Sequence, residues 1–161
     1  MKILLLGSNG QLGKQLRRDL PLLNPTIPLS KKSLDITNFE MLNDFINKYT
    51  PEIIINAAAY TKVDKAEKNK DKAFAVNSTA IDYLSKISFK KDIWLIHFST
   101  DYVFDGTKKI GYTEDDKTNP LSVYGQSKLA GENKILKSKC KHIIFRTSWV
   151  CGKYGDNFIK T

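Results

Sequence analysis

Short apolar runs alternate along this chain with longer stretches of helical pattern, and this alternation constrains the fold more than any other feature. The runs are rich in Ile and Leu and have the length of strands that are buried on both faces of a sheet. They lie at residues 2–6, 27–29, 53–56, 93–98 and 142–147. Helices between successive strands allow the strands to run parallel, so we expect an α/β fold with a doubly wound parallel sheet.

The length and charge of the chain restrict its organisation and its partners. Its 161 residues suffice for one sizeable core, so we expect residues 1–161 to form a single domain. The net charge is +9, from 26 Lys and Arg against 17 Asp and Glu. Because the basic residues are scattered, without an Arg cluster or an aromatic platform, we expect no nucleic-acid binding. They would attract anionic ligands such as a dinucleotide or a sugar nucleotide.

The apolar runs and the cysteines bear on the cellular compartment. No run approaches the ~18 to 20 apolar residues of a membrane span, and the first run ends too soon for a signal peptide. We therefore expect a soluble, cytoplasmic protein with no membrane partner. Cys140 and Cys151 form no Cys-x-x-Cys pair and have no neighbouring His cluster, so we expect reduced structural thiols and no metal site.

A glycine-rich turn follows the first apolar run. Gly7, Gly10 and Gly13 have the spacing Gly-x-x-Gly-x-x-Gly, and the helix after them is expected to end before Pro21. Glycines at a strand-to-helix turn let the backbone approach a pyrophosphate, whose charge meets the N–H groups and positive dipole end of the helix. A tight turn without a ligand is the alternative interpretation. The position directly after a buried strand favours dinucleotide binding and a Rossmann-like fold.

The end of the second apolar run bears on the choice of cofactor. Ser30, Lys31 and Lys32 stand there. Enzymes that are strict for NAD usually place an acidic residue at this point, where it binds a ribose 2′-hydroxyl. Because Lys31 or Lys32 could instead bind a 2′-phosphate, we expect NADPH as the cofactor and keep NADH as an alternative. Two solvated surface lysines are the other interpretation.

Helix signals complete the first half of the chain. Thr37 and Glu40 are spaced as a capping box at the start of a helix. The small residues 57–59 follow the third apolar run and would leave room for the middle of a cofactor. A longer helix is expected over 72–87, with Asn77 on its apolar face. This amide either has a buried partner or belongs to a catalytic water relay.

The residues best suited to catalysis lie between Thr100 and Lys128. Thr100 follows the fourth apolar run, at the sheet edge where open α/β folds bind ligands. Tyr124 and Lys128 are four residues apart in a helix expected over 123–139, so phenol and ammonium share one helix face. A nearby cation favours the phenolate and lowers the pKa of a tyrosine. The alternative is a half-buried aromatic residue beside a solvated lysine.

Five segments of the chain occur together in one order. They begin at Gly7, Asn56, Ser99, Val123 and Arg146 and read GxxGxxG, NAAAYTxVDxAE, STDYVFxG, VYGxxKLAGE and RTSWV. In this combination the chain resembles the dTDP-4-dehydrorhamnose reductase family of the extended short-chain dehydrogenases/reductases, along essentially its whole length. The resemblance implies an oxidoreductase of dTDP-rhamnose biosynthesis. Such an enzyme reduces the C4 ketone of a nucleotide-sugar substrate, dTDP-4-dehydro-L-rhamnose, to dTDP-L-rhamnose with NADPH or NADH.

The resemblance also implies roles for particular residues. Tyr124 would donate the proton to the developing alkoxide, Lys128 would bind the nicotinamide ribose and acidify Tyr124, and Thr100 would hydrogen-bond the ketone oxygen. Asp101 and Trp149 match positions that contact substrate in the family. The positions that match the cofactor lining are Gly10, Gln11, Leu12, Ser30, Asp35, Ile36, Ala59, Tyr60, Thr61 and Phe98.

Several features depart from the family pattern. Ser30 stands where members usually have an aspartate, which leaves the cofactor preference open. Gln15 replaces a glutamate that helps hold a magnesium ion at the dimer interface of some members, so no metal is predicted and a homodimer stays an open alternative. Family members are nearly twice as long, so we expect the smaller C-terminal substrate domain to be largely absent. Residues 157–159 would begin a further helix.

Two other functions compete with the reductase. A dehydratase or epimerase of the same superfamily is one, but dehydratases usually follow the Thr-Asp pair with a glutamate, where this chain has Tyr102. A non-catalytic regulatory subunit resembling the β subunit of methionine adenosyltransferase is the other. Intact Thr100, Tyr124 and Lys128 argue against it.

Overall fold

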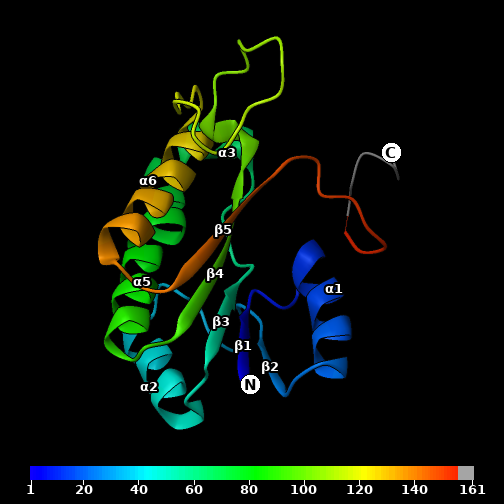
Figure 1. Cartoon of the computed structure of the whole chain (residues 1–161), viewed down its shortest axis with the longest axis vertical. Coiled ribbons are helices and arrows are strands. Elements are labelled where there is room, and N and C mark those ends of the chain that lie inside the picture. The colour runs from blue at the N-terminus through cyan, green and yellow to red at the C-terminus, as the bar shows by residue number, and fades with distance from the viewer. Residues whose placement is uncertain (156–161) are drawn as a thin grey trace.

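Five parallel strands form the central sheet of the computed structural model, which describes residues 1–155 (Figure 1). The strands are β1 (Ile3–Leu6), β2 (Thr26–Leu29), β3 (Ile53–Asn56), β4 (Trp94–Thr100) and β5 (His142–Thr147). They lie in the order β2-β1-β3-β4-β5, and each neighbouring pair is parallel. The predicted doubly wound, Rossmann-like sheet is thus confirmed, and the strand order changes direction between β1 and β3.

Helices cover both faces of this sheet. Helix α1 lies on one face, and α2, α5 and α6 lie on the other (Figure 1). The helices are α1 (Gln11–Asp19), α2 (Phe39–Tyr49), α3 (Val63–Lys68), α4 (Lys70–Phe74), α5 (Ala80–Lys90) and α6 (Val123–Ser138). Short 3-10 turns, η1 (Leu20–Leu22) and η3 (Asp101–Val103), follow α1 and β4. Pro21 therefore lies inside a 3-10 turn that continues α1.

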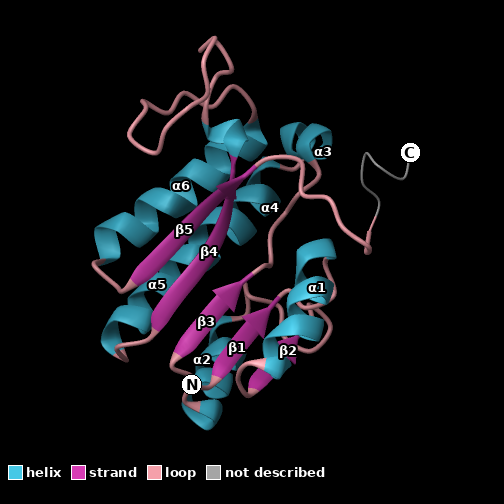
Figure 2. Cartoon of the chain, turned by 45° about the vertical axis from the view of Figure 1, so that its right-hand side comes forward, coloured by secondary structure: helices cyan, strands magenta, loops and turns pink. Residues whose placement is uncertain are grey.

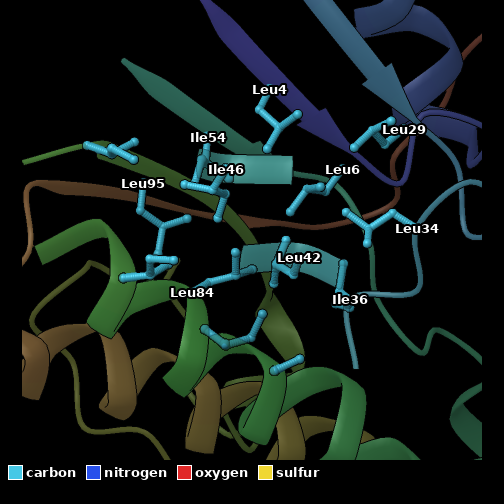
Figure 3. Close-up of a cluster of buried hydrophobic side chains, with 14 of the residues drawn as sticks. Leu4, Leu6, Leu29, Leu34, Ile36, Leu42, Ile46, Ile54, Leu84 and Leu95 are labelled. Atoms are coloured by element: carbon cyan, nitrogen blue, oxygen red, sulfur yellow. The ribbon is translucent and has the colours of Figure 1, made fainter. Parts of the chain in front are cut away.

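Alternate side chains of β1 enter two different cores. Leu4 and Leu6 pack with Leu42 of α2 and Leu84 of α5 in the larger core (Figure 3). Leu5 belongs to a smaller cluster on the face that α1 covers. Each fully buried aliphatic side chain of this kind stabilises the fold by roughly 1.5 to 3 kcal/mol. Because both faces of β1 are buried, its sequence is apolar without interruption.

Strand β4 separates its side chains in the same way, and this positions polar groups. Leu95, His97 and Ser99 are buried on one face, whereas Ile96 and Phe98 pack on the face of the smaller cluster. On that second face α1 lies over β1 and β2, away from β4 and β5 (Figure 2). The exposed side chains of Ile143 and Phe145 on β5 are consistent with this placement.

Two helix predictions need correction. The residue that caps α2 is Asn38, whose Oδ1 accepts from the Met41 amide at 3.0 Å, so the predicted capping box at Thr37 is wrong. The Thr37 hydroxyl instead donates to Asp35 Oδ1 at 2.8 Å. The helix predicted over 72–87 is interrupted by a π-helical turn, η2 (Ala75–Thr79), between α4 and α5.

The membrane and cysteine expectations can be compared with the described residues. Within residues 1–155, none of the helices combines the length and the apolar composition that crossing a membrane requires. Both cysteines are free; Cys140 is buried, but Cys151 is exposed and so is not part of the core. The helix expected to begin at 157–159 lies outside the described residues.

Candidate active site

A cleft of about 220 Å³ lies at the carboxyl ends of β1 and β3, where the strand order changes direction. Open α/β sheets bind ligands at this kind of switch point. Six of the residues predicted to bind the cofactor line it, namely Gly7, Gly10, Asp35, Ile36, Ala59 and Tyr60. This opening, called the first cleft from here on, therefore brings together segments that follow three different strands.

The glycines of the first turn have separate structural reasons. Gly7 has φ +77°, in the left-handed region, and a Cβ there would lie 2.5 Å from the Ala58 amide nitrogen. A Cβ at Gly13 would lie 2.1 Å from the Gly7 carbonyl oxygen, so Gly13 allows α1 to pack closely on the turn. Gly10 is the N-cap of α1 and has space for a Cβ, with its nearest neighbour at 3.4 Å.

The start of α1 suits an anion. Gly10 provides no side-chain cap, and the first turn of the helix contains no acidic residue. The N–H groups and the positive dipole end of a helix stabilise a phosphate placed there. The turn thus has the features of an anion-binding helix start, and its assignment to a dinucleotide stays a prediction.

The outer wall of the first cleft carries opposite charges. Lys31 Nζ lies 3.4 Å from Asp35 Oδ2, and both residues line the cleft. Partial burial raises the pKa of Asp35, but hydrogen bonds from Thr37 and Lys31 lower it overall. Ser30 contacts Ser33, with 3.1 Å between the two hydroxyl oxygens. Of the two candidate lysines, Lys31 is the one that reaches the cleft.

A second cleft, of about 350 Å³, adjoins the ends of β4 and β5. Thr100, Asp101, Tyr124 and Trp149 line it together, and Thr61 contributes from the segment after β3. These are the predicted proton donor, the predicted ketone-binding hydroxyl and both predicted substrate contacts. Residues separated by up to 88 positions in the sequence therefore share one opening.

The side chain of Tyr124 is half-buried and lines the second cleft. Burial raises its pKa, and hydrogen bonding with the Thr100 side chain lowers it in part. The ring meets that of Tyr102 edge-on, with 5.7 Å between centroids. The expected lowering of the Tyr124 pKa by Lys128 is not found, because the lysine is directed elsewhere.

Lys128 is buried, with 1% of its surface exposed. Its ammonium nitrogen lies 2.6 Å from the Phe98 carbonyl oxygen and 3.3 Å from His97 Nε2. Burial lowers the pKa of Lys128 to about 8, against a smaller raising effect of Glu132. The alternative of a solvated lysine is therefore wrong, although the tyrosine beside it is half-buried, as that alternative expected.

Residues outside the predicted site hold its elements in place. Asn77, in the π-helical turn, accepts from the Tyr60 amide at 2.8 Å and donates to the Tyr60 carbonyl at 3.0 Å and to Ser127 Oγ at 3.0 Å. Asn77 therefore has a buried partner, which was the first of the two interpretations of its position on the apolar helix face. At the start of α6, Glu67 accepts from the Val123 amide at 2.9 Å.

Sequence reasoning missed a buried polar network between β4, β5 and α6. Glu132 accepts hydrogen bonds from Ser99 and from Arg146, whose guanidinium also meets the Glu114 carbonyl. Asn56 and His97 lie side by side on β3 and β4. The available signal was a polar residue inside the runs 53–56, 93–98 and 142–147, because such a residue needs a buried partner.

Some predicted cofactor residues lie outside the first cleft. The Phe98 ring stacks on the Phe145 ring, with 5.6 Å between the centroids, on the sheet face opposite Lys128. Only the carbonyl group of Phe98 therefore contacts Lys128. Gln11 donates to the Val150 carbonyl, beside the second cleft. Gly13 and Leu12 are in α1, and their roles there stay predictions.

Comparison with known proteins places this geometry in a family. The family model described as the RmlD substrate binding domain matches residues 1–161. The chain belongs to this family.

Two named relatives show how far the similarity extends. The dTDP-4-dehydrorhamnose reductase of Salmonella typhimurium is 45% identical over 166 aligned residues, which include 100% of this chain and 55% of the relative. The solved structure of a dTDP-4-dehydrorhamnose reductase from Bacillus anthracis in complex with NADP matches with a TM-score of 0.95 and 43% identity, over 99% of this chain and 57% of that one.

A third relative carries a different name. The spore coat polysaccharide biosynthesis protein SpsK of Bacillus subtilis is 39% identical over 161 aligned residues, with 99% of this chain and 57% of the relative covered. The chain therefore spans little more than half the length of the curated relatives it matches.

Proposed function

We propose that residues 1–161 form the NAD(P)-binding domain of a dTDP-4-dehydrorhamnose reductase, which reduces the C4 ketone of dTDP-4-dehydro-L-rhamnose. The observation that carries this proposal is the second cleft, where Thr100, Asp101, Tyr124 and Trp149 meet. Relatives at 41% to 45% identity bear the name of this reductase. Since those relatives are longer, the substrate pocket would be completed by residues beyond this chain.

The first cleft fits a dinucleotide. The turn at Gly7 and Gly10 and the uncapped start of α1 would hold the pyrophosphate, and Asp35 with Lys31 would face the adenosine ribose. NADPH is the proposed cofactor because Lys31 lines the cleft and because the Bacillus anthracis relative was solved with NADP. NADH stays an alternative, since Asp35 could accept from a 2′-hydroxyl.

The chemistry divides between cofactor and chain. A nicotinamide cofactor supplies the hydride when it is bound. Thr100 would donate a hydrogen bond to the ketone oxygen and hold it near the phenol. Tyr124 would then donate its proton to that oxygen as charge develops, which is general acid catalysis. Fixing these groups around one carbonyl lowers the entropic part of the barrier.

The direct test follows nicotinamide absorbance. The full-length protein is mixed with dTDP-4-dehydrorhamnose and NADPH, and oxidation of the cofactor is expected to depend on the sugar nucleotide. The Thr100→Val variant of the same protein serves as a control, because it keeps the shape of the side chain and loses the hydroxyl. Full-length protein that binds both compounds and oxidises no NADPH would defeat the reductase proposal.

The competing functions receive less support. A dehydratase would need an acid at position 102, and Tyr102 there presents its ring to Tyr124. A regulatory subunit would have no need for Thr100 and Tyr124 in one cleft.

A further inference from the structure

The segment 148–155, which we call the crossing segment, connects the two clefts. It follows β5 and crosses over the end of the sheet toward α1 (Figures 1 and 2). Trp149 and Val150, near its start, line the second cleft. Its far end lies beside α1, whose N-cap, Gly10, lines the first cleft. A contact between the crossing segment and α1 can therefore link the two proposed ligand sites.

Trp149 has a main-chain conformation that depends on its surroundings. Its φ is +46°, in the left-handed region that bulky side chains rarely adopt. The residue is 76% exposed, so packing of its own ring contributes little to holding that conformation. Such a conformation persists only where the surrounding structure fixes it, and it occurs often at ligand sites. The contacts of the neighbouring residues are therefore important for the position of Trp149.

Hydrogen bonds flank Trp149 on both sides. Before it, the Thr147 hydroxyl donates to the Ser99 carbonyl at 3.2 Å, which ties the end of β5 to β4. After it, the side-chain amide of Gln11 donates to the Val150 carbonyl. Gln11 is the first residue of α1. One of the two anchors of Trp149 thus comes from the sheet, and the other comes from the helix that begins at the first cleft.

The far end of the crossing segment also packs on the first turn of α1. A Cβ at Gly155, whose φ is +76°, would lie only 3.0 Å from Gln11 Cβ. The ammonium nitrogen of Lys14, one turn along the helix, lies 6.0 Å from the centre of the Tyr154 ring. The crossing segment is thus held against α1 at residues 150, 154 and 155, and Gln11 contributes to two of these contacts.

The same turn of α1 is the proposed pyrophosphate site. Gln11 directly follows Gly10, and the N–H groups at a helix start bind phosphate. A ligand that fixes this turn fixes the direction of the Gln11 side chain as well. Its amide donor then stays directed at the Val150 carbonyl.

We propose that Gln11 is a positioning residue for Trp149, which it fixes through the Val150 carbonyl, and that this contact couples the dinucleotide cleft to the substrate cleft. Cofactor bound at the start of α1 favours the conformation of Trp149 that receives the sugar nucleotide. Because coupling between two ligands is reciprocal, the sugar nucleotide raises the affinity for the cofactor by the same factor. The identity of the two ligands rests on the proposed function, whereas the contact of Gln11 with residue 150 does not.

The environment of Trp149 can be followed by fluorine NMR of the full-length protein labelled with fluorotryptophan. The resonance that disappears in Trp149→Phe belongs to Trp149. We expect Gln11→Leu, which removes the donor, to shift this resonance in the absence of any ligand. Gln15→Leu is the matched control, because Gln15 lies one turn further along α1 and donates to Asp19 Oδ2 at 2.6 Å. A Trp149 resonance that is the same in Gln11→Leu and in the wild type would overturn the proposal.

Calorimetry on the full-length protein measures the coupling. NADPH and dTDP-L-rhamnose are both reduced, so the two bind together without reacting. In the wild type we expect saturating NADPH to lower the Kd for dTDP-L-rhamnose about five-fold or more, and in Gln11→Leu by less than about two-fold. Gln15→Leu should keep the wild-type factor. A wild type without coupling, or a Gln11→Leu variant with the full factor, would show that Gln11 does not link the sites.

The outcomes separate this proposal from the proposed function. Failure to bind dTDP-L-rhamnose would contradict the proposed function, and the fluorine spectra would still decide whether Gln11 positions Trp149. If Gln11→Leu does not fold, Gln11→Glu takes its place. This variant keeps the length of the side chain and loses the amide donor, and a carboxylate is favourable in the first turn of a helix. A wild-type Trp149 resonance in Gln11→Glu would equally refute the role of Gln11.

Discussion

The Glu132 carboxylate on α6 and the Arg146 guanidinium on β5 form a two-pronged ion pair, with Arg146 Nη2 at 2.8 Å from Glu132 Oε2. Glu132 is buried, with 1% of its side chain exposed, whereas Arg146 is 23% exposed. The pair fixes α6, which carries Tyr124 and Lys128, against the strands. A buried charge without its partner is strongly destabilising, so the two residues depend on each other.

Removal of one charge should therefore weaken the fold. We expect Glu132→Gln to lower the free energy of unfolding by about 3 kcal/mol, because Arg146 loses its partner and Ser99 loses a charged acceptor. Urea denaturation followed by circular dichroism measures this. Glu114→Gln is the matched control, since Arg146 contacts only the main-chain carbonyl of Glu114. Equal stabilities of the two variants would show that the pair contributes little.

Gly7 and Gly10 of the first turn should respond differently to substitution by alanine. At Gly7, the positive φ and the approach to Ala58 predict a loss of about 2 kcal/mol or more in the free energy of unfolding. Gly10→Ala has space for its methyl group and should fold normally, but the methyl would obstruct a phosphate at the helix start. Thermal denaturation and NADPH titration of both variants separate the two effects. Unimpaired NADPH binding by Gly10→Ala would place the pyrophosphate elsewhere.

The phenol of Tyr124 should be needed for turnover and not for cofactor binding. Tyr124→Phe keeps the ring that packs on Tyr102 and removes only the proton donor. In the full-length protein we expect kcat to fall about 10² to 10⁴-fold while the Kd for NADPH changes by a few-fold at most. Tyr102→Phe is the control for loss of a phenol in the same cleft. Similar turnover by Tyr124→Phe would mean that another group donates the proton.

Lys31 should select between the two cofactors. It lines the first cleft beside Asp35, whereas Lys32 does not. Lys31→Ala should weaken NADPH binding by about ten-fold, as expected for loss of one charge-assisted contact to a 2′-phosphate, and leave NADH binding unchanged. Lys32→Ala should change neither affinity. Equal losses of affinity for NADPH and NADH would mean that Lys31 binds a part of the cofactor that both molecules share, and not the 2′-phosphate.

The buried Lys128 should make stability depend on pH. Its pKa is about 8 in the folded protein against an ordinary value of 10.5, so between these pH values the unfolded state binds more protons. The free energy of unfolding therefore rises with pH across this window and gains nothing more from this group above it. Below pH 8 the folded protein must bury the charged form, which costs stability.

Lys128→Met should remove this dependence. We expect the variant to be more stable than wild type near neutral pH, by about 1 to 3 kcal/mol, because methionine carries no charge to bury. The loss of the hydrogen bond to Phe98 limits the gain. Urea denaturation at several pH values tests the slope, and Lys134→Met, at an exposed position on α6, is the control. If Lys128→Met kept the pH dependence of stability seen in the wild type, that dependence could not be assigned to Lys128.

The sequence by itself indicated the fold and the candidates for the reacting groups. Apolar runs such as Ile53–Asn56 have the length and composition of buried strands, and helical patterns between successive runs predict crossover helices. The spacing of Tyr124 and Lys128 placed both on one helix, and the position of Thr100 placed it at the sheet edge. These features are local, or follow from the general rules of parallel sheets, so they can be read without coordinates.

Only the tertiary structure decided how the buried groups are paired. His97 and Lys128 are 31 residues apart, and nothing local to either shows that they meet in the core. The same applies to Asn77 and Ser127, which are 50 residues apart and are joined by a hydrogen bond of 3.0 Å. Long-range hydrogen bonds depend on the register of strands and on how closely helices pack, and these are set by the whole core at once. The direction of the pKa shift of Lys128 therefore emerged only from the folded chain.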